Sequence, residues 1–248
     1  MILTILGSGS LVPSLKRGTQ GFLLQENSTN ILIDSGSGTL YRLLKAGLTY
    51  NDINILCYTH CHLDHFADFP VFLFTSKYGI PPRATDLTVM GGKGFLSYYK
   101  KIQDIYSRTI ESDLFDVNIV EMPDMQISGM TIRTCRIPHS PESAAYRFTS
   151  KDGKSVVISG DTDHSPDLVD LAEDTDLLVC ECSYPDGMKV DGHLTPSYAG
   201  RIAREADAKK LVLTHLYPPT EDVDLVAQCE HEFEGEIVVA EDGMEIEV

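Results

Sequence analysis

The most informative segment of the chain is Thr59-His60-Cys61-His62-Leu63-Asp64-His65, in which four side chains are of the types that bind metals. Imidazole nitrogens and a carboxylate oxygen are the ligands that a borderline divalent cation such as zinc prefers. His60 and His62 lie two residues apart, so on an extended segment both side chains point the same way. Asp64 and His65 follow where the chain could turn, and there they would face a second ion. The stretch therefore predicts a metal site.

Three more ligand-type residues come after apolar runs that are typical of strands. They are His139 after residues 130–137, Asp161 after residues 156–158, and His215 after residues 211–213. Alone, such a histidine is more often structural and such an aspartate more often a turn former. However, ligands gather at the carboxyl ends of strands in layered α/β folds, and the histidine cluster provides a site for them to join. Asp161 could bridge two cations roughly 3.5–4 Å apart, and His215 would complete the second ion.

Two other residues at element ends have open interpretations. His193 precedes a predicted helix start, where anions are attracted, and could protonate a leaving oxygen or stabilise a phosphoryl oxygen. A surface histidine before a helix cap would give the same pattern. Asp34 ends the apolar run Ile31–Ile33. It is compatible with a role in the site and, equally, with an ordinary turn. His164 and His231 lack comparable support, and we interpret both as surface residues.

Short apolar runs alternate with helical patterns in both halves of the chain. Ser165-Pro166 and Thr195-Pro196 each combine an N-cap residue with proline at the first helical position. The leucines within residues 40–44 have helical spacing, and Gly47 is placed to follow the helix end. No repeat, low-complexity tract or linker interrupts the chain. We therefore expect a single domain, residues 1–248, in which helices cover sheets.

Composition and charge restrict the partners. The 248 residues carry a net charge of −17 and no Lys/Arg run longer than two, so extended nucleic acid is a disfavoured partner. A small anionic substrate remains compatible, because a bound metal would supply positive charge. No apolar run approaches the roughly 20 residues of a membrane helix. Six cysteines without disulfide-framework spacing, and no signal-peptide pattern, predict a cytoplasmic protein with reduced thiols.

The ligand-type residues, in this order, resemble the motifs of the metallo-β-lactamase fold superfamily. The similar segments are Asp34 after its strand, Thr59 to His65, Pro138-His139, Ser159 to Thr162 and Leu213 to His215. The resemblance implies the α/β class: an αββα sandwich of two mixed β-sheets flanked by helices, forming one hydrolase domain with the site along one edge. It further implies that His60, His62 and His139 bind one ion, that Asp64, His65 and His215 bind the other, that Asp161 bridges, and that Asp34 orients ligands or the site loop from behind.

Within the superfamily, the chain most resembles the ribonuclease Z and small phosphodiesterase branch. The similar segments are Gly7 to Ser10 with Pro13, Glu181 to Tyr184, and Gly192 to Thr195. This resemblance implies that His193 is catalytic and that Asp64 both binds metal and handles the proton of the attacking water. In ribonuclease Z, a long arm that grips transfer RNA is inserted between the third-motif histidine and the bridging aspartate. Here Asp161 follows His139 by only 22 positions, which is enough for a hairpin and no arm.

These observations predict a hydrolase with two divalent metal ions, zinc in preference to manganese or iron. We expect it to be a phosphodiesterase for a small nucleotide or cyclic-phosphate substrate. Three alternatives stay open: a transfer-RNA 3′-end endonuclease, a thioester, sulfate-ester or lactone hydrolase, and a non-catalytic metal-binding protein. An acid at His193 argues against the last, since binding alone needs no acid. A homodimer is compatible with the sequence.

Overall fold

The chain forms fourteen strands, seven α-helices and three short 3-10 helices, and the computed structural model describes all residues 1–248. The strands are β1 (Ile2–Gly7), β2 (Gly21–Glu26), β3 (Thr29–Ile33), β4 (Ile55–Cys57), β5 (Leu87–Gly91), β6 (Val117–Glu121), β7 (Met125–Ile127), β8 (Met130–Arg136), β9 (Ala144–Thr149), β10 (Ser155–Ile158), β11 (Leu177–Glu181), β12 (Lys210–Thr214), β13 (Glu236–Val239) and β14 (Glu245–Glu247). The helices are α1 (Thr39–Lys45), α2 (Leu63–Phe66), α3 (Phe69–Tyr78), α4 (Phe95–Tyr106), α5 (Pro166–Ala172), α6 (Pro196–Glu205) and α7 (Leu225–Cys229), with 3-10 turns η1 (Tyr50–Asp52), η2 (Ser107–Thr109) and η3 (Pro218–Asp222).

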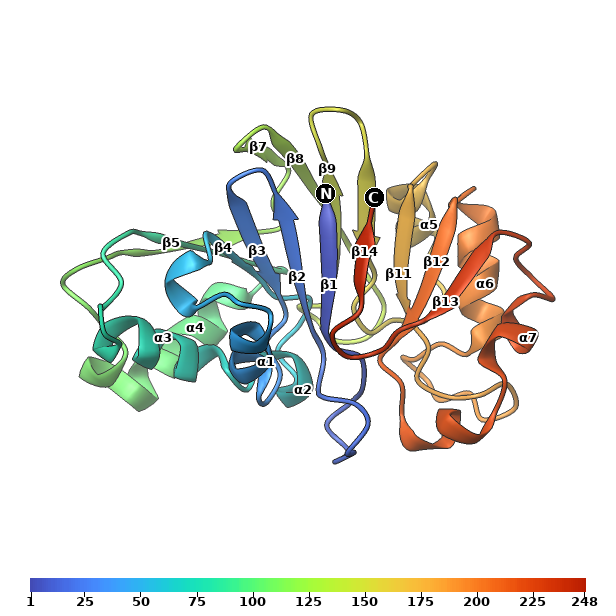
Figure 1. Cartoon of the computed structure of the whole chain (residues 1–248), viewed down its shortest axis with the longest axis horizontal. Coiled ribbons are helices and arrows are strands. Elements are labelled where there is room, and N and C mark those ends of the chain that lie inside the picture. The colour runs from blue at the N-terminus through green and yellow to red at the C-terminus, as the bar shows by residue number, and fades with distance from the viewer.

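Two seven-stranded mixed sheets make up the centre of the molecule (Figure 1). The first has the order β14-β1-β2-β3-β4-β5-β6 and the second the order β13-β12-β11-β10-β9-β8-β7. Strands β3 to β6 are parallel to one another, as are β10 to β13, and the remaining pairs are antiparallel. The two halves of the chain thus build similar sheets, one each, except that the last strand, β14, returns to pair with β1.

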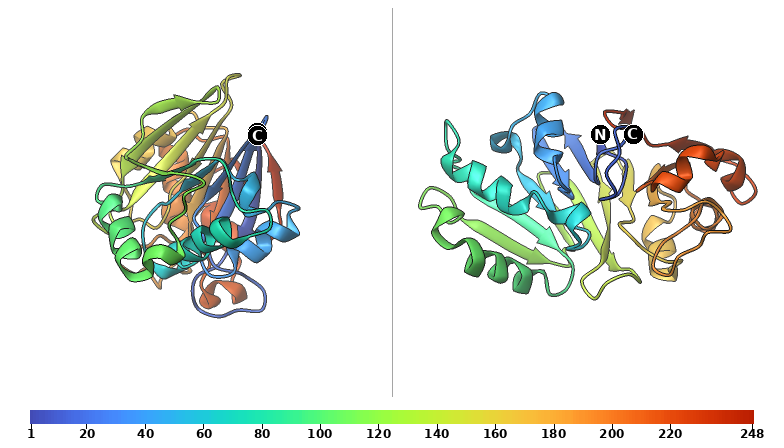
Figure 2. Two further views of the ribbon diagram at one scale, coloured as in Figure 1. Left: turned by 90° about the vertical axis from the view of Figure 1, so that its left-hand side faces the viewer. Right: turned by 90° about the horizontal axis from the view of Figure 1, so that it is seen from below.

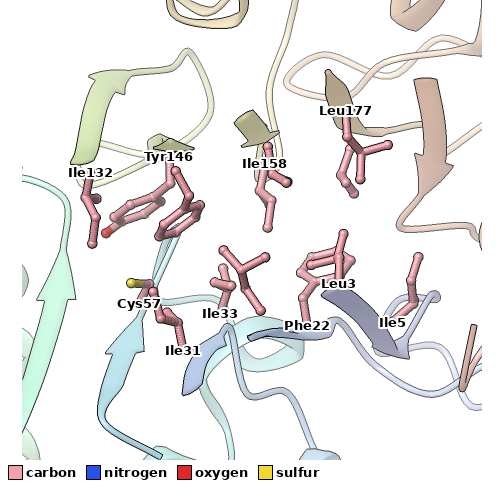
Figure 3. Packing of buried hydrophobic residues seen from close by; sticks show 14 of the residues in the cluster. Leu3, Ile5, Phe22, Ile31, Ile33, Cys57, Ile132, Tyr146, Ile158 and Leu177 are labelled. Carbon is pink, nitrogen blue, oxygen red and sulfur yellow. The ribbon is translucent and has the colours of Figure 1, made fainter. Parts of the chain in front are cut away.

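Alternation of side chains along each strand creates the layers. Ile31 and Ile33 of β3 join the core between the two sheets, where they face residues such as Tyr146 and Ile158 of the second sheet (Figure 3). Leu32, between them, joins the apolar cluster under the helices of the first half. A third cluster lies between the second sheet and α5, α6 and α7. Successive side chains point to opposite faces of a sheet. One face of each sheet therefore packs in the core between the sheets, and the other packs against helices. The predicted αββα sandwich is confirmed.

The predicted helix starts are also confirmed. Helix α6 begins after Thr195 and buries Ala199, Ile202 and Ala203. The leucine spacing within residues 40–44 correctly predicts α1, in which Leu43 is buried and Leu44 is 56% exposed. A helix of about two turns lies on its sheet with a single row of side chains. Leu44, which directly follows Leu43, therefore points to solvent.

The architecture brings the ends of distant strands to one edge. Strands β3, β4, β10 and β12 all end at the edge where α2 lies (Figure 1), and the right-hand view of Figure 2 looks at the molecule from this side. Parallel strands in each half make this convergence possible, since their carboxyl ends lie together. None of the helices is long and apolar enough to span a membrane.

Candidate metal centre

Ligand-type side chains from both halves of the chain meet at this edge. The groups whose ligand atoms all lie within 4.8 Å of one another are His60, His62, His139 and Asp161; Asp64, His65 and His215; and Asp161, His193 and His215. The seven residues that the sequence predicts as ligands all belong to the first two groups. His193 lies beside them in the third. The side chains can therefore hold metal ions.

Asp161 lies between the two main groups. Its Oδ2 is 3.6 Å from Nε2 of His60 and 3.7 Å from Nε2 of His139. Its Oδ1 is 3.2 Å from Nε2 of His65 and 3.5 Å from Nε2 of His215. The two oxygens of one carboxylate thus face different histidines, which is the geometry needed for contact with two neighbouring cations.

Two buried atoms at this point lack a partner in the protein. Nε2 of His60 and Oδ1 of Asp161 are buried and accept no hydrogen bond. Buried polar groups are nearly always paired, so such atoms require an explanation. Burial lowers the pKa of His60 well below its usual value, which keeps the ring neutral and a lone pair available. A neutral imidazole and a carboxylate are both donors to divalent cations, so the residues fit a metal ion.

Asp34 fixes the ring of His65 from behind. Nδ1 of His65 donates to Oδ2 of Asp34 over 2.7 Å. The backbone N–H and the hydroxyl of Thr59 also donate to this carboxylate, each over 2.8 Å. With Nδ1 engaged, Nε2 of His65 faces the cluster, which is how carboxylates orient histidine ligands. Asp34 has a φ of +54°, a conformation that aspartate adopts more readily than most residues.

His139 is positioned by the loop that carries His193. Nδ1 of His139 donates to the carbonyl of Gly192 over 2.9 Å. The N–H of Gly192 donates in turn to Asp163, whose other oxygen pairs with Lys189. Gly192 has a φ of +80°, and a Cβ there would lie 3.0 Å from Nδ1 of His139. One glycine peptide therefore joins the loop to a predicted metal ligand.

His193 is held by a buried carboxylate. Its Nδ1 lies 3.1 Å from Oε1 of Glu181 and 3.1 Å from the hydroxyl of Ser183. Burial lowers the pKa of His193, but the hydrogen bond and charge of Glu181, with Asp161 and Asp64, outweigh it and raise the pKa. A raised pKa favours the imidazolium form at neutral pH. His193 is thus equipped to donate a proton.

Glu181, Ser183 and Gly192 belong to the site but are not among the residues predicted from the sequence, where only their segments are singled out. One signal could have found Glu181, because it ends the apolar run Leu177–Cys180 just as Asp34 ends its own. No comparable signal exists for Gly192, whose role depends on where a distant histidine lies. His164 pairs with Glu205, and both it and His231 lie outside the three groups.

The fold and the clusters together define a hydrolase of the metallo-β-lactamase fold. The metallo-β-lactamase fold protein YhfI from Bacillus subtilis matches the structure with a TM-score of 0.84 at 26% identity, covering 100% of this chain and 99% of that chain. The short form of human tRNase Z matches with a TM-score of 0.80 at 24% identity, covering 100% and 99%. The resemblance noted in the sequence is confirmed.

Within that class, the family model of the anti-Pycsar protein Apyc1 matches residues 1–195, and the chain belongs to this family. The Mycobacterium tuberculosis protein Rv1339 is 29% identical, with 98% of this chain and 92% of that protein covered. A ribonuclease Z of Myxococcus xanthus is 28% identical, with 99% and 97% covered.

The alignments also compare lengths. The alignment with the M. xanthus ribonuclease Z spans 304 positions, and since this chain has 248 residues, at least 56 positions have no residue here. The alignment with Rv1339 spans only 252 positions. Between His139 and Asp161 the structure contains just the antiparallel hairpin of β9 and β10. The hairpin expected in place of an arm is confirmed.

Proposed function

We propose that the protein is a dinuclear metal-dependent phosphodiesterase acting on a small nucleotide or cyclic-phosphate substrate. The observation that carries this proposal is the pairing of a two-part metal centre with His193, a histidine held by a buried glutamate. His60, His62 and His139 would hold one ion, Asp64, His65 and His215 the other, and Asp161 would contact both. Zinc is the ion that this set of nitrogen and oxygen donors suits best.

Two divalent cations supply Lewis acidity and positive charge to a phosphodiester when bound at this centre. Asp64 has the position to orient the attacking water and take its proton. Oδ2 of Asp64 lies 3.3 Å from Nε2 of His215, so this carboxylate is within the centre where the water would be activated. His193 would give its proton to the leaving oxygen, and Glu181 would stabilise the charged ring and fix its direction.

A small substrate is favoured by three observations. The net charge of −17 opposes the approach of a polyanion. The hairpin of β9 and β10 occupies the segment between His139 and Asp161, so no arm is inserted there. The half-buried position of His193 places it beside the metal groups rather than on an open face.

Transfer-RNA 3′-end cleavage is the second candidate, and the 28% identity to a ribonuclease Z favours it. It would require a basic surface from a partner or from elsewhere on the chain. Hydrolysis of a thioester, sulfate ester or lactone would use the same ions and is distinguished by a substrate panel. A protein that only binds metal would need no proton donor, so the pairing of His193 with Glu181 argues against this alternative.

The first test measures metal content and hydrolysis of bis-p-nitrophenyl phosphate for the wild type, His193→Ala and His231→Ala. His231 is an exposed histidine outside the metal groups, so its variant is the matched control. We expect two metals per chain in all three proteins, and a loss of turnover of about 10²–10⁴-fold in His193→Ala alone.

Loss of an ion from His193→Ala would make His193 a ligand and contradict its role as the acid. Two metals without any phosphodiester turnover would overturn the phosphodiesterase and direct the search to thioesters and lactones.

A further inference from the structure

The hydroxyl of Ser183 joins three side chains at the metal centre. Its oxygen lies 2.9 Å from Nδ1 of His215, 3.1 Å from Nδ1 of His193 and 2.6 Å from Oε2 of Glu181. Ser183 is fully buried, so the protein alone supplies its hydrogen-bond partners. One hydroxyl therefore connects a predicted metal ligand, the proposed acid and the carboxylate that holds this acid.

The direction of each hydrogen bond follows from the protons available. A serine hydroxyl donates one proton and can accept two, whereas a carboxylate only accepts. The proton of Ser183 therefore goes to Glu181, and the oxygen of Ser183 accepts the Nδ1–H of each ring. His215 then carries its proton on Nδ1 and keeps a lone pair on Nε2, which is the form of histidine that binds a metal.

The backbone of His215 is strained, and Ser183 helps to hold it. Its φ is +59°, in the left-handed region that residues other than glycine adopt uncommonly. Such a conformation persists only where the surrounding structure enforces it. The N–H of Leu216 donates to the carbonyl of Ser8 over 2.9 Å, and that of Tyr217 donates to the carbonyl of Ser183 over 3.3 Å. Ser183 thus contacts both the ring of His215 and the turn that follows it.

The other ring nitrogen of His215 faces the predicted ions. Its Nε2 lies 3.3 Å from Oδ2 of Asp64 and 3.5 Å from Oδ1 of Asp161. The ring is also nearly parallel to that of His193, with planes 9° apart and centroids 5.8 Å apart. Because both Nδ1 atoms meet one oxygen, the hydroxyl sets the position of the two rings relative to each other.

Glu181 is itself held in place by the backbone. Its Oε1 accepts from the N–H of Thr162 over 2.8 Å, directly after the predicted bridging ligand Asp161. Its own N–H donates to the hydroxyl of Ser159 over 3.0 Å. Glu181 is 1% exposed, and a buried polar network whose members are all paired is rigid. The carboxylate can therefore orient the groups that it contacts.

We propose that Ser183 is a positioning residue that connects Glu181 to His215, and so couples the ion at His215 to the acid His193. The part that concerns His193 rests on the proposed phosphodiesterase function, whereas the part that concerns the ion does not. Oε1 of Glu181 contacts His193 directly over 3.1 Å, but the contact of Glu181 with His215 runs through the hydroxyl. Removal of the hydroxyl should therefore separate these two effects of Glu181.

The test combines zinc binding and turnover in a double-mutant cycle. The variants are Ser183→Ala, Ser183→Thr, Glu181→Gln and the double variant Ser183→Ala/Glu181→Gln. Competition with a chelator gives the affinity for each of the two zinc ions, and hydrolysis of bis-p-nitrophenyl phosphate at saturating zinc gives kcat and KM. Ser76→Ala is the control, because Ser76 is also fully buried but its hydroxyl has no partner.

We expect Ser183→Ala to weaken the binding of one zinc ion about 10- to 100-fold, because a ligating histidine loses its partner, and to leave the other ion within about threefold. Ser183→Thr keeps the hydroxyl and should restore most of the affinity. Glu181→Gln should weaken the same ion, since an amide offers a proton where the carboxylate accepts one. In the absence of the hydroxyl, Glu181→Gln should weaken this ion by less than about twofold more.

Turnover should respond differently from zinc binding. At saturating zinc, Glu181→Gln should lower kcat about 10- to 100-fold whether or not Ser183 is replaced, because the direct contact with His193 is lost in both cases. KM should change less than about twofold, since the acid acts on the leaving oxygen and not in binding. Ser76→Ala should match the wild type in every measurement.

Three results would overturn the inference. Unchanged zinc affinity in Ser183→Ala would show that the hydroxyl does not orient His215. Further weakening of the ion by Glu181→Gln without the hydroxyl would show that the carboxylate acts on the ion through its charge. Equal weakening of both ions, not restored by Ser183→Thr, would make Ser183 a general support of the fold.

Two further outcomes are distinguishable from these. If Ser183→Thr does not fold, Glu181→Gln tests the same link, because glutamine has the size of glutamate. If the zinc results are as expected but no variant and no wild type cleaves a phosphodiester, the connection to His215 stands and the proposed function fails.

Discussion

Gly192 combines two requirements in one residue. Its φ of +80° is a conformation that L side chains rarely adopt, and its carbonyl accepts the hydrogen bond from His139. A Cβ would also approach Nδ1 of His139 to 3.0 Å. In the same loop, Gly187 has a φ of +85° but only open space where its Cβ would be. Substitution of either glycine would strain the backbone, but only substitution of Gly192 would also disturb His139.

We predict that Gly192→Ala weakens metal binding about 10- to 100-fold, because it disturbs the partner that orients His139. Gly187→Ala should lower the free energy of unfolding by about 1 kcal/mol and leave metal affinity unchanged. Competition with a chelator gives the affinity, and urea unfolding gives the stability. Equal metal loss in both variants would show that loop strain, rather than the contact with His139, is responsible.

At the scale of elements, one carboxylate joins the starts of three parallel strands. Asp176 precedes β11 and accepts from the N–H of Ser155 at the start of β10 over 2.9 Å. It also accepts from Lys154 over 3.2 Å and from Lys209, which precedes β12, over 2.9 Å. The opposite ends of these strands lead to Asp161, Glu181 and His215. Asp176 therefore supports the alignment of strands that position the site.

We predict that Asp176→Asn destabilises the protein by about 1 kcal/mol at pH 7, a modest value because the ion pairs are partly exposed. Burial raises the pKa of Asp176, but hydrogen bonds from Lys209, Ser155 and Lys154 outweigh it and lower the pKa. Its contribution is therefore complete above the unfolded pKa of about 3.9, and is lost as the pH falls through the folded value.

Urea unfolding midpoints of the wild type and the variant at pH 7 and pH 3 measure this difference, which should shrink at pH 3. Asp152→Asn, in the exposed turn between β9 and β10, is the control and should have little effect at either pH. A difference that persists undiminished at pH 3 would mean that the charge of Asp176 does not stabilise the strands.

At the scale of the molecule, the negative charge belongs to one half of the chain. Residues 1–120 contain ten basic and ten acidic side chains, whereas residues 121–248 contain ten basic and 27 acidic ones. The half that builds β1 to β6 is thus neutral, and the half coloured from green-yellow to red in Figure 1 carries the whole charge of −17. The metal centre lies where these halves meet, so an anionic substrate approaches beside a strongly acidic surface.

We predict that kcat/KM for a cyclic nucleotide rises severalfold when salt is increased from about 10 mM to about 150 mM, because screening weakens this repulsion. Binding of transfer RNA through basic residues would have the opposite dependence and weaken steeply with salt. Steady-state kinetics at constant pH and metal concentration measure the effect. A steep fall of kcat/KM with salt would favour the nucleic-acid enzyme.

The layers and most of the candidate centre could be predicted from local patterns in the sequence. Alternating apolar residues such as Ile31, Leu32 and Ile33 fix which face of a strand each side chain occupies, whatever the rest of the chain does. His60, His62, Asp64 and His65 are neighbours in sequence, and so they are neighbours in space. His139, Asp161 and His215 follow strands, and this local context predicts their edge of the sheet.

The division of the ligand-type residues into two groups, and the contacts that orient them, could not be predicted from local patterns because they depend on the packing of the sheets. The two oxygens of Asp161 face different histidines because strands from both halves converge there. The contacts of Gly192 with His139, of Glu181 with His193 and of Ser183 with His215 join residues between 12 and 53 positions apart. The exposure of Leu44 depends likewise on how α1 lies on its sheet. Local patterns fix which face of an element a residue occupies, but contacts between distant loops exist only after the sheets have packed.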